Sequence, residues 1–144
     1  MTYSPPLGAR RRQSVQAYAN IGLETQVLSA SPERLITLLF DGARAAMMKA
    51  RLHMENGNLE GRGMALSKAI DIVDSGLKAS VDQEAGGELA KNLVATYDLV
   101  IRNLLLANLN ADLEKLALAE QLLTNVAEAW RQAVDPARSE AMVG

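Results

Sequence analysis

His53 is the only histidine of the chain, so it is the first candidate for proton or phosphoryl transfer near neutral pH. Helical bundles that relay phosphate carry an exposed histidine in the middle of a helix. His53 is instead predicted near the end of a helix, and the lysine and glycine pattern that accompanies a relay histidine is incomplete. A histidine phosphorelay bundle is therefore an alternative reading of this chain and not the leading one.

The remaining polar residues do not form a catalytic or metal-binding pattern. A di-iron bundle needs Glu-x-x-His on two helices, but position 50 is alanine and there is no second histidine. There is no cysteine to supply a thiolate. Gly86-Gly87-Glu88 lacks the Gly-Lys-Ser/Thr of a phosphate-binding loop. The serines have no histidine and acid at a spacing that suggests a triad. We expect no enzymatic activity, no cofactor and no metal ion.

Composition favours a single all-α domain, and the lack of a catalytic constellation favours a binding function. Of the 144 residues, 49% are hydrophobic and 3% aromatic, so the core must consist of leucine, alanine, isoleucine, valine and methionine. The formal charge of −2, without a large basic block, argues against nucleic acid as a partner. No apolar run approaches the roughly 20 residues that cross a bilayer, so membrane insertion is not expected. The missing cysteines and signal peptide favour the cytoplasm.

Apolar residues at a spacing of three to four predict four long helices. The first runs from Pro32 to about Asn56, with Ser31 as its N-cap and Gly57 as its left-handed stop. The second spans about 64–81, and a loop over 82–87 follows it. The third spans about 88–109. The fourth begins after Asn110 or Asp112, either of which can cap it, and ends near 134. Short connections between such helices favour an antiparallel four-helix bundle.

Two helices carry more apolar surface than one core face requires. On the first, Ile36 and Phe40 form a second line beside the main stripe, which is either denser core packing or a surface kept for a partner. On the third, Leu93, Tyr97 and Ile101 form a ridge at a spacing of four, which is either core or the wall of a binding groove. Within Leu104-Leu105-Leu106 at least one side chain must leave the core. The predicted inward set of this helix is Leu89, Leu93, Tyr97, Val100, Ile101, Leu104 and Leu105.

The ends of the chain differ from the predicted bundle at 15–134. Residues 1–14 contain two prolines and the basic run Arg10-Arg11-Arg12, and they are predicted to be a flexible tail. Residues 15–28 carry Val15, Tyr18 and Ile21 at helical spacing but have no cap. A helix this short is marginal on its own, so we expect it to rest on the bundle or to order when a partner binds. Residues 135–144 are predicted to be a second flexible tail.

Short stretches in order along most of the chain resemble those of one protein family. They are Ala17-Tyr18, Ser29-Ala30-Ser31-Pro32-Glu33-Arg34-Leu35-Ile36, Leu39-Phe40-Asp41-Gly42-Ala43, Leu66-Ser67-Lys68-Ala69-Ile70, Glu84-Ala85-Gly86-Gly87-Glu88-Leu89-Ala90-Lys91-Asn92-Leu93, Tyr97-Asp98, Ala107-Asn108-Leu109 and Glu128-Ala129-Trp130. Each stretch is weak alone, but the series in register over about 15–134 is specific. In these stretches the chain is similar to the flagellin-specific export chaperone (FliS) family.

The resemblance implies a bacterial cytoplasmic chaperone with a four-helix-bundle fold. Such chaperones bind the disordered C-terminal region of flagellin, prevent its premature polymerisation and assist its delivery to the flagellar type III export gate. Tyr18 matches a tyrosine of the family's N-terminal segment, which is thought to cover part of the flagellin groove in the empty protein. Phe40 stands where many members have tyrosine, and the resemblance does not account for Arg10-Arg11-Arg12.

These arguments together give a set of predicted partner-binding residues, from the N-terminal segment, the second apolar line and the ridge. The set is Val15, Tyr18, Ile21, Ile36, Phe40, Leu93, Tyr97 and Ile101. The empty protein is a possible homodimer. Besides the phosphorelay bundle, a self-assembling structural subunit is a further alternative, and the sequence does not identify the flagellin served.

Overall fold

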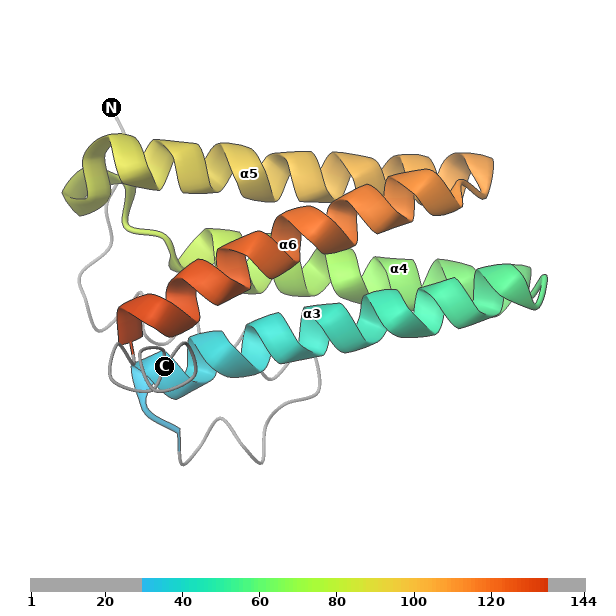
Figure 1. Cartoon of the computed structure of the whole chain (residues 1–144), viewed down its shortest axis with the longest axis horizontal. Coiled ribbons are helices and arrows are strands. Elements are labelled where there is room, and N and C mark those ends of the chain that lie inside the picture. The colour runs from blue at the N-terminus through green and yellow to red at the C-terminus, as the bar shows by residue number, and fades with distance from the viewer. Residues whose placement is uncertain (1–29, 135–144) are drawn as a thin grey trace, which may run out of the picture.

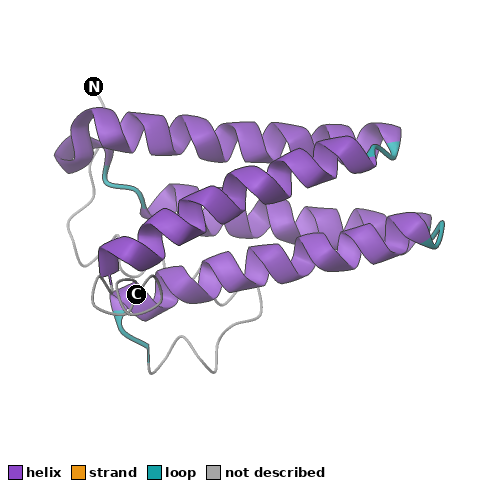
Figure 2. Ribbon diagram, in the orientation of Figure 1, coloured by secondary structure: helices purple, strands orange, loops and turns teal. Residues whose placement is uncertain are grey.

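Four α-helices make up the part of the chain that the computed structural model describes, residues 30–134 (Figure 1). They are α3 (Pro32–Glu55), α4 (Leu59–Asp71), α5 (Gln83–Asn110) and α6 (Leu113–Val134). A π-helical turn, η1 (Ile72–Leu77), and a 3₁₀ turn, η2 (Lys78–Ser80), continue α4 toward α5. The connections between the helices are short loops (Figure 2). The predicted segments 1–14, 15–28 and 135–144 lie outside the described residues.

Consecutive helices run antiparallel, and the predicted four-helix bundle is confirmed (Figure 1). The helix α3 packs against α4 and α6, and α5 packs against the same two helices. Two polar contacts link neighbouring helices. Arg51 of α3 pairs with Glu120 of α6, and Arg62 Nε of α4 donates to Asn108 Oδ1 of α5 at 3.1 Å. No helix among residues 30–134 is long and apolar enough to cross a membrane.

Short polar side chains fix where three of the helices begin. Ser31 Oγ accepts from Arg34 N at 3.1 Å, and Pro32 follows it, so the predicted start of α3 is confirmed. Asp82 Oδ1 accepts from two backbone N–H groups at the start of α5. Asp112 Oδ1 does the same for α6, which decides between the two capping residues that the sequence left open.

The helix α4 begins at Leu59, and the predicted start at Met64 is wrong. Gly61 and Gly63 suggested a weakly specified connection, because each costs a helix about 1 kcal/mol relative to alanine. The Asn58 side chain accepts from Gly61 N at 2.9 Å and supplies the missing cap. A cap of this kind is worth about 1 kcal/mol, and the contact of Arg62 with α5 adds a tertiary restraint that sequence periodicity does not reveal.

The predicted loop over 82–87 is in fact a capped helical turn. Gly87 then interrupts it with φ 55° and ψ −135°, a conformation that side-chain-bearing residues rarely adopt. The uninterrupted part of α5 therefore starts at Glu88, as predicted. The result is a kink in the first turns of α5 and not a flexible connection.

Gly76 lies in the π-helical turn η1, which packs against α3. A Cβ atom at this position would stand 2.8 Å from Leu39 Cδ2, and Leu39 is fully buried. By helix propensity alone Gly76 would only weaken its helix, by about 1 kcal/mol relative to alanine. The structure shows that the glycine makes room for a side chain at the centre of the core.

The core consists almost entirely of aliphatic side chains from all four helices. Its fully buried large members include Leu39 and Met47 of α3, Leu66 of α4, Leu104 of α5 and Leu116 of α6. The one buried polar residue among residues 30–134, Asn103, donates to the carbonyl oxygen of Leu99 at 2.8 Å.

Two predicted core residues of α5 are exposed. Leu105 is 55% exposed, because successive helical residues are rotated by about 100° and Leu104 takes the inward position. Leu89 is 77% exposed and lies two residues after the kink at Gly87. The part of α5 that faces the core is thus shorter than its run of apolar residues predicted.

We expect Gly76→Ala to lower the free energy of unfolding by about 1–3 kcal/mol, because Leu39 must move within a filled core. The matched control is Gly63→Ala in α4, where a new Cβ has no atom within 4 Å. That variant should raise stability by up to about 1 kcal/mol through helix propensity alone. Urea unfolding of both variants measures the difference, and equal stabilities would show that the contact with Leu39 relaxes without cost.

Candidate functional site

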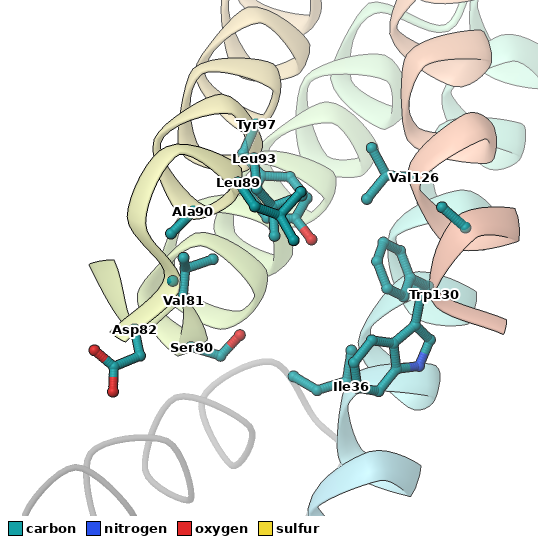
Figure 3. A pocket seen from close by; sticks show the side chains of 13 residues that line it. Ile36, Ser80, Val81, Asp82, Leu89, Ala90, Leu93, Tyr97, Val126 and Trp130 are labelled. Atoms are coloured by element: carbon teal, nitrogen blue, oxygen red, sulfur yellow. The ribbon is translucent and has the colours of Figure 1, made fainter. Parts of the chain in front are cut away.

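The three aromatic residues of the described part, Phe40, Tyr97 and Trp130, all line one pocket. The pocket lies where α3 begins and α6 ends, and its volume is about 450 Å³ (Figure 3). The aromatic side chains of residues 30–134 therefore lie together at one end of the bundle. Apolar cavities of this size, with a few polar groups, are typical of ligand and peptide sites.

Three helices and the segment before α5 contribute to the pocket through simple helical spacing. On α5, Leu89, Leu93 and Tyr97 recur every four residues and point across the pocket toward α6 (Figure 3). Ile36 and Phe40 on α3, and Val126 and Trp130 on α6, show the same spacing. The full lining is Ile36, Phe40, Ser80, Val81, Asp82, Gly86, Leu89, Ala90, Leu93, Tyr97, Val126, Ala129 and Trp130.

Polar contacts outside the pocket hold its walls in place. Lys78 Nζ of η2 lies 2.6 Å from Asp98 Oδ1 of α5, which fixes the turn that carries Ser80 and Val81. The hydrogen bond to Asp98 raises the pKa of Lys78 above its usual value. On the other wall, Trp130 Nε1 donates to Thr37 Oγ1 at 3.3 Å and so fixes the plane of the indole. The pocket is preformed before any partner arrives.

Tyr97 is the aromatic residue at the base of the pocket. It is 3% exposed, and its hydroxyl points toward the pocket space (Figure 3). Burial raises the pKa of this hydroxyl well above its usual range, because the phenolate would lose its hydration. The group is therefore a neutral donor and acceptor within an otherwise apolar wall.

The structure brings together four of the eight predicted partner-binding residues. Ile36, Phe40, Leu93 and Tyr97 all line the pocket. Ile101 does not, because it lies one turn further along α5 and packs against the core. The other three predicted residues, Val15, Tyr18 and Ile21, lie outside the described residues.

Sequence reasoning missed the pocket residues that α6 and the start of α5 provide. The predicted partner-binding set contains no residue of the fourth helix, and Leu89 was predicted to face the core together with Val100. The signal that could have found Trp130 is its rarity, since it is the only tryptophan of the chain. Leu89 could not have been found in this way, because its exposure depends on the kink at Gly87.

The residue types lining the pocket do not support catalysis. Histidine, cysteine, lysine and arginine are missing from its described lining. His53 lies in the last turn of α3, as predicted, and its ring packs against Gly61. Within residues 30–134 no group of three acidic, histidine or cysteine side chains could hold a metal ion. The geometry suits the binding of an apolar segment and not a reaction.

Comparison with known proteins identifies the family of the chain. A family model described as "Flagellar protein FliS" matches residues 14–137. The chain belongs to the FliS family. The flagellar secretion chaperone FliS of Salmonella typhimurium is 53% identical over 118 residues, which cover 82% of this chain and 87% of that protein. The Escherichia coli chaperone FliS is 44% identical over 122 residues, covering 85% and 90%.

A more distant FliS protein also matches most of the chain. The flagellar secretion chaperone FliSB of Pseudomonas aeruginosa is 36% identical over 118 residues, covering 82% of this chain and 93% of that protein. The resemblance seen in the sequence is thus confirmed, and the chain is a flagellar secretion chaperone and not an enzyme.

We expect Tyr97→Phe to flatten the alkaline loss of stability. The folded state holds the Tyr97 proton more tightly than the unfolded chain, in which tyrosine titrates near about pH 10. The contribution of this proton to the free energy of unfolding is complete below that pH. It is lost as the pH rises above it, at up to about 1.4 kcal/mol per pH unit. Lys78 acts in the same direction in both proteins, so the difference between them isolates Tyr97. Identical pH profiles in urea unfolding would contradict the assignment.

Proposed function

We propose that this chain binds the disordered C-terminal region of flagellin, with apolar side chains of that region entering the aromatic pocket. Binding there would keep flagellin from polymerising early in the cytoplasm and help deliver it to the flagellar type III export gate. The observation that carries the proposal is the pocket itself, an open apolar site that contains every aromatic side chain of the described part. An amphipathic helix laid into an apolar groove is a common mode of peptide recognition.

The energetics of the pocket agree with capture of an unfolded segment. Each Å² of apolar surface removed from water contributes about 25 cal/mol. A segment that folds on binding loses part of this energy to its own ordering. A preformed pocket adds no ordering cost on the chaperone side, because Trp130 and η2 are already fixed by hydrogen bonds and ion pairs. The preformed pocket thus raises the affinity, while the ordering of the captured segment lowers it and keeps binding reversible.

We expect Leu89→Asp to weaken binding of a flagellin C-terminal peptide by about 1–2 kcal/mol, or roughly 5- to 30-fold. Leu89 lines the pocket but is 77% exposed, so the substitution should leave stability nearly unchanged. Leu109→Asp is the matched control, since Leu109 is 78% exposed on the same helix and is not part of the pocket. Fluorescence of Trp130, titrated with a tryptophan-free peptide, measures both affinities.

Several results would count against the proposed function. Equal affinities for the two aspartate variants would place the flagellin site elsewhere. Loss of function in His53→Gln, with binding intact, would favour the phosphorelay alternative. A chain that forms large assemblies alone and no complex of defined ratio with flagellin would favour the structural subunit. Size measurement with and without flagellin separates this last case, and it also tests whether the empty protein is a homodimer.

We further propose that Val15, Tyr18 and Ile21 cover the pocket in the empty protein and that flagellin displaces them. The cover then lowers the apparent affinity by the fraction of time for which the pocket is open. Hydrogen exchange of residues 15–28 should therefore become faster when the flagellin peptide binds, and removal of residues 1–20 should promote self-association. Unchanged protection would contradict displacement, and stronger protection would show that the segment clamps the partner.

A further inference from the structure

A second cleft adjoins the aromatic pocket. It has a volume of about 270 Å³ between α3 and α6, and it shares Phe40 and Trp130 with the pocket. Its other lining residues are Arg34, Thr37, Asp41, Arg44, Ala127, Glu128, Arg131 and Val134. The two sites are therefore separated by only two aromatic side chains, and one of these is held by a hydrogen bond to Thr37.

The sequence of α3 sets the two sites side by side. Ile36 and Phe40, four residues apart, face the aromatic pocket. Arg34, Thr37, Asp41 and Arg44 follow one another at spacings of three and four, so they form a second row along the neighbouring face. One helix thus presents an apolar row to one site and a charged row to the other.

The second cleft carries positive charge on a protein whose formal charge is −2. Three arginines and two carboxylates line it. Arg131 lies 2.5 Å from Glu128 and is neutralised by it. Arg34 and Arg44 are both exposed and form no ion pair with any residue of 30–134. Two exposed guanidinium groups are therefore available to bind an acidic partner. Asp41, which lies between them along α3, is the remaining negative charge of the cleft.

We propose that the flagellin segment anchored in the aromatic pocket continues past Trp130 into the second cleft and places carboxylate groups against Arg34 and Arg44. The inference rests on the proposed function, and it adds that the partner must be amphipathic in sequence, with an apolar anchor next to acidic residues. Arginine suits this role because its planar fork binds carboxylates through two hydrogen bonds. In this arrangement the apolar pocket provides the affinity. The charged cleft fixes the direction in which the bound segment runs and the position of its residues along the site.

The test is charge reversal in the full-length chain. Arg34→Glu together with Arg44→Glu should weaken binding of the flagellin C-terminal peptide about ten-fold at low salt, as expected for two exposed ion pairs. The affinity of the parent chain should fall with salt, and that of the double variant should not. A peptide whose acidic residues are replaced by their amides should bind both proteins equally. Arg102→Glu, an exposed arginine of α5 outside both sites, is the matched control and should bind as the parent does.

The outcomes separate this inference from the proposed function. If Leu89→Asp weakens binding while the arginine variant does not, the aromatic pocket is used and the second cleft is not, which overturns the inference alone. If both variants bind as the parent chain does, both proposals fail. Tighter binding by the arginine variant would show a basic segment in the cleft and would also overturn it. Removal of residues 135–144 should leave the arginine effect intact, and its disappearance would assign the cleft to this chain's own tail.

Discussion

The close approach of α3 to its neighbours is the contact on which the rest of the structure depends. Leu39 enters the space left by Gly76 in η1, and Ala43, Ala46 and Ala50 continue the same buried face of α3 without large side chains. A core with hardly any aromatic residues must gain its dispersion energy from such short distances. Phe40 and Tyr97 belong to the end of this core that also forms the wall of the pocket, and Trp130 packs against it.

The pocket follows from irregularities at one end of an otherwise regular bundle. The π-helical and 3₁₀ turns continue α4 as far as Val81, where the backbone becomes extended, and the conformation of Gly87 turns the beginning of α5. Val81, Leu89 and Leu93 border the pocket beside these features. π-Helical turns are often found near functional sites, and here the turn lies next to the wall of the pocket.

Sequence reasoning recovered what local rules determine and missed what tertiary contacts determine. The four helices, the cap at Ser31 and the stop at Gly57 follow from periodicity and backbone preference, and the structure confirms them. The start of α4 depends on Asn58 and on the contact of Arg62 with α5, and the latter spans 46 positions of sequence. Of the predicted ridge of α5, Leu93 and Tyr97 line the pocket and Ile101 does not, whereas Trp130, which was not in the predicted set, lines it. A spacing of four shows that residues lie on the same face of a helix. It does not show which part of that face lines a pocket and which part packs against the core.

The antiparallel order of the four helices places the first residue of α3 and the last residue of α6 at the same end as the pocket (Figure 1). Any chain that precedes Ala30 or follows Val134 is thus tethered beside the site. A short flexible tether holds its cargo at an effective concentration of about millimolar. A tethered segment can therefore compete with a free partner even when its intrinsic affinity is poor. The length and composition of these adjoining segments then set the concentration at which a free ligand can bind, without any change in the walls of the pocket.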